Sequence, residues 1–502
     1  MGISYSTPAP SEKLPAAASS LRQLVVPARD DVGDEAPPPY SASAPTTTVS
    51  PSQIRNWEET LLQDPKNRLA ITTLATTPFT TLLRNQPTLR TDTQIFNIRI
   101  PLEGQPITNQ RSSGRCWLFA ATNVFRVPLM NRYHLADFEL SQAYLFYWDK
   151  IEKANYFLEQ IVSTSGLDLS SRLVQTLLRD PVTDGGQWDM LANVVRKYGL
   201  VPHVLYPDPV NAQASAKMDW LVTAKLREHA LKLRSLVRKS GCDGAMDAAV
   251  ARAKDDALRE IHALVTLMLG PPPRPDEEFV WEFDDAVSGR ARRVVDTPRG
   301  FAEKAFTMAA TRKTEVDPTS MISLVNDPRN EFGRLMTVDR LGNVVEGRPI
   351  TYVNVDMKTI KAAAIAMLRA GHPVFFGCDV GKFSDSGLGV MDAELWDLEL
   401  AFNATLGMTK AERLSSGESS MTHAMVLTAV HVEDGKPVRW RVQNSWGDQV
   451  GDKGWFVMTD RWMDEYTFQV VVDPRFVSKE VRDILNQEPT VLPRWDPMGV
   501  LA

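Results

Sequence analysis

The segment NQRSSGRCWLFAA, residues 109–121, places one cysteine, Cys116, where an apolar helix is expected to begin. Free N–H groups and the dipole at a helix N-terminus favour an anion, and the thiolate is the attacking form of cysteine. A neighbouring imidazolium would hold the pKa of this thiol below that of a free cysteine. Gln110 can add a side-chain N–H donor, so Gln110 and the Cys116 backbone N–H are predicted to form an oxyanion hole.

A histidine and an amide are expected to meet at one end of a β-hairpin, THAMVLTAVHVEDGKPVRWRVQNSW, residues 422–446. Its Asp-Gly dipeptide, residues 434–435, is a strong tight-turn signal and sets His423 opposite Trp446. Position 444 is two residues along on the same face, so Asn444 is predicted to lie close to His423. An asparagine partner can hold a histidine in one tautomer, which is the role of the third member of a nucleophilic triad.

The second histidine of this hairpin is predicted to lie apart from that pair. In the same register His431 is opposite Val438, about 26 Å from His423 at about 3.3 Å per residue. This position offers it no amide partner. We therefore expect His423 to be the base that serves Cys116.

The other cysteines and histidines show no further chemistry. Three cysteines cannot form a disulfide framework, and no secretory signal precedes them. Cys242, in a turn between helices, and Cys378, at the end of an apolar strand, are predicted to be structural. The other histidines lack metal-ligand spacing. We expect a reduced, cytoplasmic protein that needs no metal and no cofactor.

Composition limits the class of protein. The chain has 502 residues, 43% of them hydrophobic, which is enough for two or three packed units. Its net charge of −6 gives no overall attraction to nucleic acid or to an anionic membrane. No stretch approaches the length of a membrane-spanning helix, so we expect no membrane partner.

The order of helical and strand-like patterns predicts an α+β chain of two lobes. Residues 1–53 are rich in Pro, Ala, Ser and Thr, and such a composition predicts a disordered tail. Residues 54–207 are predicted to form a helical lobe that carries the nucleophile, and residues 208–345 a large helical insertion. Residues 346–480 are predicted to form a β-rich lobe with the histidine and the asparagine, and residues 481–502 a C-terminal arm.

Three short signals lie in the predicted tail, and each has an ordinary alternative. MGISYS fits the N-myristoylation pattern at Gly2, but no basic cluster or nearby cysteine supplies a second anchor. PPPY, residues 37–40, is a type of ligand that WW domains bind, and a proline-rich tail also produces it by chance. The first 29 residues hold three basic residues and one acidic residue, which is a feature of transit peptides. A WW-domain partner and a partly mitochondrial location are the corresponding expectations.

Three segments, in this order along the chain, resemble the active-site segments of papain-like cysteine peptidases. QRSSGRCWLFAA resembles the nucleophile segment, with Gln110 and Cys116 in the oxyanion and nucleophile positions. THAMVLTAV resembles the histidine segment, which implies that His423 is the base. VQNSWGDQVGDKGWFVM resembles the Asn-Ser-Trp-Gly segment, which implies that Asn444 orients the histidine and that Trp446 shields the bond between them.

The resemblance extends over residues 60–502 and narrows to one subgroup. GRCWLFAATN, FFGCDVGKF and the C-terminal DPMGVLA match the bleomycin hydrolases, which are aminopeptidases. This implies a papain-like fold and a homohexamer whose active sites face an internal channel. It also implies removal of N-terminal residues from peptides, and hydrolysis of bleomycin and homocysteine thiolactone. Members lay the C-terminal arm in the cleft, so Ala502 is expected to bind substrate through its terminal carboxylate. Trp446, in the Asn-Ser-Trp-Gly segment, is also expected to bind substrate.

Two alternatives compete with this prediction. Cys116 alone is well explained as a small buried hydrophobe, whereas four matching positions in order favour catalysis. The basic stretches KLREHALKLRSLVRK and RARRVV are typical of solvated faces, but family members can bind DNA through a positively charged channel. The rival hypothesis is a nucleic-acid-binding oligomer with secondary peptidase activity.

Overall fold

The computed structural model describes residues 49–240, 248–311 and 318–501. Contacts between Cα atoms divide the chain into two compact units, Met1–Pro65 and Lys66–Ala502. The lobe boundaries that the sequence suggested inside the second unit stay predictions.

The described part of the first unit contains helix α1 (Pro51–Gln63), which is capped by the Ser50 side chain. The predicted tail therefore overlaps this helix at residues 51–53. Gly2, the PPPY motif and the basic residues of the possible transit sequence lie outside the described residues.

Three long helices of the second unit surround the expected nucleophile. Helix α5 (Cys116–Tyr133) begins at Cys116, as predicted, and nearly all of its side chains are buried. Helix α6 (Gln142–Ser163) begins after Ser141, whose side chain caps it as the sequence suggested. Helix α8 (Trp188–Tyr198) packs against both α5 and α6. The predicted helical environment of Cys116 is therefore present.

The end of α5 differs from the prediction. The sequence suggested that this helix stops before Pro128, whereas Pro128 lies inside it and the helix continues to Tyr133. Proline has no N–H, so the helix loses one backbone hydrogen bond at this position. Val127, Leu129 and Met130 are buried around the proline, and their packing offsets the missing bond.

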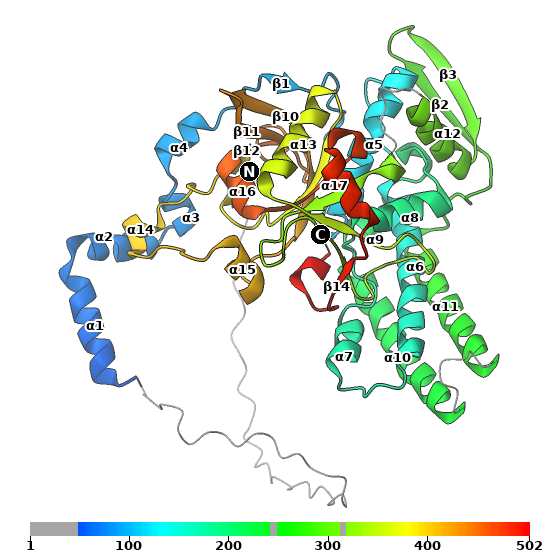
Figure 1. Cartoon of the computed structure of the whole chain (residues 1–502), viewed down its shortest axis with the longest axis horizontal. Helices are drawn as coiled ribbons and strands as arrows, with labels where there is room; N and C mark the ends of the chain where they lie inside the picture. The colour runs from blue at the N-terminus through cyan, green and yellow to red at the C-terminus, as the bar shows by residue number, and fades with distance from the viewer. Residues whose placement is uncertain (1–48, 241–247, 312–317, 502) are drawn as a thin grey trace, which may run out of the picture. The chain divides into compact units, whose positions relative to one another are not determined.

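Helices α10 (Ala216–Ser240) and α11 (Ala248–Leu269) are the two long helices that the charged pattern predicted. They pack against each other and against α6 (Figure 1). The buried residues of α11 form one face of the helix, as amphipathic spacing requires: Val250, Ala257, Ile261, Val265 and Leu269.

The stretch 208–345 also contains strands that the sequence patterns did not reveal. Strands β2 (Phe279–Asp285) and β3 (Arg290–Asp296) form a separate two-stranded hairpin, followed by helix α12 (Pro298–Thr311). Two further strands of this stretch, β4 (Ile322–Val325) and β5 (Arg334–Val338), join the main sheet. The basic RARRVV motif lies on β3, so its alternate residues face opposite sides of a strand.

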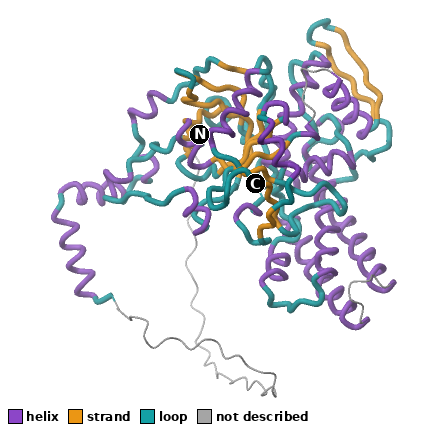
Figure 2. The backbone as a smooth tube through the Cα atoms, viewed as in Figure 1, coloured by secondary structure: helices purple, strands orange, loops and turns teal. Residues whose placement is uncertain are grey.

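The main sheet, part of the orange trace in Figure 2, has twelve strands over the described residues. Their order is β14-β5-β6-β4-β13-β7-β10-β11-β12-β9-β8, with β1 paired to β10. Helices α5 and α13 pack on β10. The strands are β1 (Ile98–Arg99), β4 (Ile322–Val325), β5 (Arg334–Val338), β6 (Tyr352–Asn354), β7 (Val374–Cys378), β8 (Ser384–Asp385), β9 (Val390–Met391), β10 (His423–Glu433), β11 (Lys436–Gln443), β12 (Trp455–Thr459), β13 (Thr467–Val472) and β14 (Thr490–Leu492).

The predicted α+β class is confirmed by this combination of a large sheet with long helices. The remaining α-helices are short, apart from α13: α2 (Pro65–Leu74), α3 (Phe79–Leu82), α4 (Gln86–Thr91), α7 (Arg172–Arg179), α9 (Val210–Gln213), α13 (Met357–Arg369), α14 (Leu398–Phe402), α15 (Lys410–Ser416), α16 (Asp460–Tyr466) and α17 (Lys479–Asp483). Within residues 49–240, 248–311 and 318–501, no helix has both the length and the apolar character needed to cross a bilayer.

Strands β10 and β11 form the predicted hairpin around its Asp-Gly turn, with two irregularities. Next to the turn the register shifts by one residue. His431 therefore lies opposite Arg439, whereas the prediction placed it opposite Val438. A second shift near Leu427 restores the predicted register. Because the two shifts cancel, Val426 and Leu427 lie opposite Gln443 and Val442, as expected from the turn.

Candidate active site

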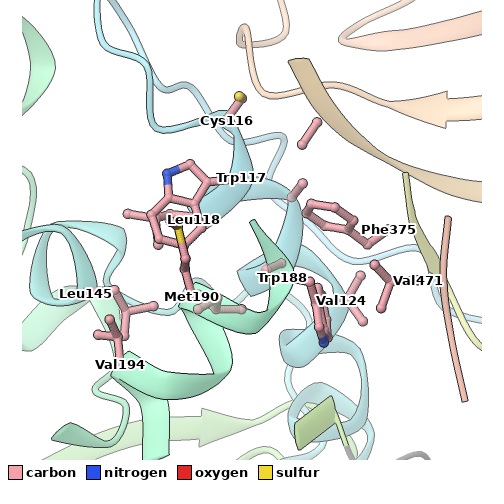
Figure 3. Packing of buried hydrophobic residues seen from close by; sticks show 14 of the residues in the cluster. Cys116, Trp117, Leu118, Val124, Leu145, Trp188, Met190, Val194, Phe375 and Val471 are labelled. Atoms are coloured by element: carbon pink, nitrogen blue, oxygen red, sulfur yellow. The ribbon is translucent and has the colours of Figure 1, made fainter. Parts of the chain in front are cut away.

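Cys116 is the first residue of α5 and lies at the edge of the buried core. Figure 3 shows its sulfur pointing away from the packed side chains, among them Trp117 and Trp188. The backbone N–H groups of Trp117 and Ala424 face the sulfur and favour its ionised form, which acts to lower the pKa of the thiol. Because Ala424 follows His423 on β10, the fold brings the thiol to the start of the strand that carries the histidine.

His423 and Asn444 are joined by the hydrogen bond that the hairpin predicted. His423 Nε2 lies 3.0 Å from Asn444 Oδ1, and the Ser445 backbone N–H donates to the same oxygen over 2.8 Å. The second bond fixes the orientation of the amide, because a backbone N–H requires an acceptor. His423 Nε2 must therefore carry a proton, which leaves Nδ1 free to accept one.

The indole of Trp446 lies beside this pair, as predicted. Its ring centroid is 4.9 Å from that of His423, and the two ring planes are tilted by 32°. His423 and Asn444 are both buried, so the hydrogen bond between them is protected from water. A protected bond to an amide holds the imidazole in a single orientation.

Gln110 is held at both ends of its amide. Its Nε2 donates to the Ser113 carbonyl over 2.6 Å, and its Oε1 accepts from the Ser445 hydroxyl over 2.8 Å. One Nε2 proton remains for an external acceptor. Ser445 was missed by the sequence reasoning, although it lies inside the NSWG segment. Its role in holding Gln110 depends on a contact between distant parts of the chain.

The protonation of the site differs from the expectation of an acidic thiol. Burial raises the pKa of the Cys116 thiol to about 11, although backbone N–H groups act in the opposite direction. Burial also lowers the pKa of His423 to about 4, against the effect of the Asn444 hydrogen bond. Each shift disfavours a lone charge in the pocket. A thiolate and an imidazolium are stable here only when they form together and compensate each other.

The loop 184–186 packs against the start of α5. Trp117 Nε1 donates to the Asp184 carbonyl over 2.7 Å, and a Cβ added to Gly186 would lie 2.5 Å from the Trp117 ring. Lys153, buried on α6, donates to the Gly185 carbonyl over 2.7 Å. This loop is therefore fixed beside the nucleophile with its backbone close to the site. The sequence showed the double glycine but not the buried lysine that holds it.

The C-terminal arm contacts the residue that follows this loop. The Gln187 side chain donates to the Val500 carbonyl over 3.0 Å, and Leu501 packs against the core. Ala502, which was predicted to bind substrate, lies outside the described residues.

Of the remaining candidates, His431 lies apart from this arrangement, whereas Cys378 adjoins it. His431 contacts Glu433 over 2.8 Å at the other end of the hairpin. Cys378 is buried on β7 opposite His423, and burial raises the pKa of its thiol well above the usual value. Cys242 lies outside the described residues. In the part of the chain that the structure describes, no three His, Cys, Asp or Glu side chains are grouped to hold a metal ion.

The arrangement provides the parts of nucleophilic catalysis. A thiol at a helix N-terminus lies near an imidazole whose free Nδ1 can accept its proton, and an amide orients that imidazole. The Cys116 backbone N–H and the Gln110 side chain can donate to an oxyanion formed when the sulfur attacks a carbonyl carbon. These parts suit acyl transfer through a covalent thioester.

Comparisons with known proteins agree with this chemistry. Residues 48–499 match the model of the Peptidase C1-like family. The chain is 42% identical over 465 residues to "Cysteine proteinase 1, mitochondrial" of Saccharomyces cerevisiae, covering 91% of this chain and 94% of that protein. It is 41% identical over 450 residues to human bleomycin hydrolase, covering 88% and 96%. The crystal structure of PepW from Lactobacillus rhamnosis HN001 superposes with a TM-score of 0.85 at 38% identity, covering 91% and 100%.

Proposed function

Because this chain belongs to the Peptidase C1-like family and is a cysteine peptidase with a papain-like fold, we propose that it is an aminopeptidase whose nucleophile is Cys116. The observation that carries the proposal is the His423–Asn444 hydrogen bond, because His423 begins the strand β10 that packs against α5, the helix that starts at Cys116. It gives the imidazole one free nitrogen and one orientation. A buried structural cysteine would need neither.

In the acylation step, His423 Nδ1 takes the proton of Cys116 as the sulfur attacks the scissile carbonyl carbon. The carbonyl oxygen becomes an oxyanion, to which the Cys116 N–H and the Gln110 side chain donate. The C–N bond then breaks, and the imidazolium gives its proton to the departing amine. Asn444 accepts from Nε2 throughout, so the imidazolium is stabilised while it exists.

In the deacylation step, a water molecule attacks the thioester and His423 takes its proton. The C–S bond breaks, the carboxylic acid leaves, and the proton returns to the sulfur. The same donors hold the second oxyanion. The residues of this chain supply every proton transfer in the cycle, and we propose no cofactor.

The C-terminal arm supports the restriction to N-terminal residues. The bond from Gln187 to the Val500 carbonyl fixes the arm next to loop 184–186, which packs on Trp117 beside the nucleophile. An arm in this position limits how far a substrate can extend past the scissile bond. We propose that the carboxylate of Ala502 meets the free amine of the substrate, because charge-assisted hydrogen bonds between such groups are strong. Trp446 is proposed to contact the bound substrate as well as to cover His423.

We propose peptides as the main substrates, with bleomycin and homocysteine thiolactone as further ones. The name of the human relative supports the first of these two. The thiolactone contains a thioester, so attack by the Cys116 sulfur opens its ring by the same acyl transfer. Both compounds present a carbonyl oxygen to which the proposed oxyanion donors would donate hydrogen bonds.

We further propose a homohexamer that acts in the cytoplasm, with part of it in mitochondria. The yeast relative is named as a mitochondrial protein, which supports the second location. A WW-domain partner of the PPPY motif remains a proposal from the sequence alone.

The rival proposal of nucleic-acid binding gains little from the basic hairpin. Arg292 contacts Asp285 over 3.1 Å, and Arg293 lies 4.0 Å from Glu282. Carboxylates on the same hairpin thus offset part of the positive charge that would be needed to bind a phosphate backbone. Peptidase chemistry is therefore the proposal that we favour.

The proposal is tested by hydrolysis of aminoacyl reporter substrates by the reduced protein, with and without a thiol alkylator. Wild type should cleave the reporters, and alkylation or Cys116→Ala should abolish cleavage. A Cys378→Ala variant is the matched control, because Cys378 is a buried cysteine without a proposed role. A reduced wild-type protein that cleaves no reporter would contradict the proposed function.

A further inference from the structure

The loop that carries the proposed nucleophile and oxyanion donor, residues 110–116, is held by a segment that begins some ninety residues later in the chain. We call residues 110–116 the nucleophile loop and residues 208–219 the clamp segment. Ser112 N–H donates to the Gln213 carbonyl over 2.9 Å, and Ser112 forms a parallel bridge with Ala214. The two segments thus lie side by side along their backbones.

The main side-chain link between them is the pair Arg115–Asp208. Both terminal nitrogens of the Arg115 guanidinium donate to the Asp208 carboxylate, over 2.9 and 2.7 Å. Arg115 is completely buried and also lies over the rings of Phe119 and Phe146. A two-fold bond of this kind fixes both the position and the rotation of the guanidinium.

The third guanidinium nitrogen, Nε, forms a hydrogen bond within the nucleophile loop. Arg115 Nε donates to the Ser113 hydroxyl over 2.8 Å, and that hydroxyl donates to the Gln110 carbonyl over 2.6 Å. The same Gln110 directs its side-chain Nε2 to the Ser113 carbonyl over 2.6 Å. Ser113 and Gln110 therefore hold each other, and Arg115 holds Ser113.

A second link secures the other side of the loop. Asp184 Oδ2 accepts from the Gly114 N–H over 2.9 Å and from the hydroxyl of Ser215, in the clamp segment, over 2.5 Å. Gly114 is thereby fixed two residues before Cys116. Both acidic residues connect the clamp segment to the loop, but only the Asp208 link continues to Gln110, because Arg115 donates to Ser113 and, over 3.4 Å, to the Gln110 carbonyl.

From this chain of contacts we propose that Asp208 is a positioning residue for the oxyanion donor Gln110 and acts on it through Arg115 and Ser113. The inference rests on the proposed peptidase function, because it assigns the role of Gln110 in that reaction. Asp208 itself touches neither the nucleophile nor the substrate. Its charge keeps Arg115 in place, and Arg115 keeps the remaining Nε2 proton of Gln110 directed at the oxyanion.

The test compares Asp208→Asn, Gln110→Ala and the double variant. Loss of one oxyanion donor lowers kcat by about 100- to 1,000-fold, so Gln110→Ala should fall in that range and Asp208→Asn should lose about 10-fold or more. KM should change little, because the oxyanion exists only in the transition state. The double variant should be no slower than Gln110→Ala alone, because Asp208 acts through the side chain that is already absent.

Alkylation of Cys116 by iodoacetamide separates positioning of the donor from general damage to the site. Attack on the CH2 group of iodoacetamide forms no oxyanion, so Asp208→Asn should alkylate at nearly the wild-type rate, as measured by mass spectrometry of the Cys116 peptide. Asp385→Asn is the matched control. It neutralises the partner of Arg84 in a partly buried pair elsewhere, and it should leave kcat unchanged.

Ser113→Ala gives the same test if Asp208→Asn fails to fold, because it removes the middle link without leaving a buried charge unpaired. The proposal is overturned if kcat of a folded Asp208→Asn or Ser113→Ala variant equals that of wild type. It is also overturned if the decrease in kcat of the double variant equals the product of the two single decreases. The same holds if the rate of Cys116 alkylation decreases by the same factor as kcat. If Gln110→Ala itself retains full activity, the oxyanion role in the proposed function has failed, independently of Asp208.

Discussion

His423 Nε2 and Asn444 Oδ1 lie 3.0 Å apart, and the Ser445 backbone N–H fixes which end of the amide faces the imidazole. The relationship decides the tautomer of the histidine. With a proton on Nε2, only Nδ1 can accept the proton of a thiol. The contact therefore turns a buried histidine into a base with one defined direction.

Replacing Asn444 with Ala should lower kcat by about 10- to 100-fold, because a hydrogen bond to a charged group contributes about 1.5–3 kcal/mol. KM should change little, since the imidazolium forms only during the reaction. Asn444→Asp should be more active than Asn444→Ala because a carboxylate also accepts from Nε2. Steady-state kinetics on an aminoacyl reporter provide the measurement. Equal activity of all three proteins would show that the contact does not orient the base.

Trp446 should control the acidic limb of the activity profile. Burial holds the pKa of His423 at about 4, and protonation of this residue removes the base, so activity is lost as the pH falls through that value. Trp446→Ala admits water, which should raise this pKa toward its usual 6.5 and move the acidic limb to higher pH. Trp446→Phe retains a ring and should shift it less. If the acidic part of the pH dependence of kcat/KM is the same in Trp446→Ala as in wild type, the indole does not influence the pKa of His423.

The alkaline behaviour of Cys116 should depend on His423. Burial places the pKa of the isolated thiol at about 11, so a His423→Ala variant should react with iodoacetamide only as the pH rises well above 9. Wild type should also react near neutral pH, because the imidazole can accept the proton and the two charges then compensate each other. The rate of alkylation at Cys116 is measured by mass spectrometry, which excludes the other two cysteines. Coincident profiles of the two proteins would rule out proton transfer to His423.

The hairpin shows how far the sequence could predict the site. An Asp-Gly turn and strand alternation were enough to align His423 with Asn444, because side chains repeat every two residues along a strand. The two one-residue shifts were not predictable, since a bulge depends on neighbouring strands and not on local composition. Because these shifts cancel, the last pair of the hairpin, Val426 opposite Gln443, is in the predicted register, and His423 meets Asn444 just beyond it.

Other features depend on packing that no local pattern reveals. Pro128 was expected to end α5, but burial of the helix outweighs the lost hydrogen bond. Cys116 was expected to have a lowered pKa at a helix N-terminus beside an imidazolium, and the sequence did not show that burial acts against this and raises the pKa of the thiol. Asp208 and Asp184 lie far from Cys116 in sequence, and an acidic residue alone does not indicate that it will face a buried partner.

Gly186 should tolerate no side chain. A Cβ at this position would lie 2.5 Å from the Trp117 ring, and overpacking of this kind costs about 1–3 kcal/mol. Gly186→Ala should therefore lower the urea midpoint and reduce activity, because Trp117 adjoins Cys116. Gly166→Ala is the matched control, since nothing lies within 4 Å of its Cβ position. Equal midpoints for the two variants would indicate that loop 184–186 moves away from Trp117 without cost.

The C-terminal arm should decide where a peptide is cut. An open papain-like cleft accepts a chain on both sides of the scissile bond, so exclusive removal of N-terminal residues needs an obstacle on one side. The arm is fixed next to loop 184–186 by the bond from Gln187 to the Val500 carbonyl. Burial of Met498 and Gly499 holds the preceding turn in place. These contacts hold the arm in place as far as Val500.

Deletion of residues 499–502 should weaken cleavage of peptides with a free amine and allow cleavage of N-acetylated or internal bonds. Adding one residue after Ala502 tests the proposed carboxylate separately from the space that the arm occupies. The addition moves the carboxylate by about 3.3–3.6 Å, and the arm still blocks the cleft. The extended protein should lose aminopeptidase activity yet still reject acetylated peptides. Matched free and N-acetylated peptides are compared by mass spectrometry, with iodoacetamide reactivity of Cys116 as the control for an intact site. If deletion leaves the preference for free amines unchanged, the arm does not set the cleavage position.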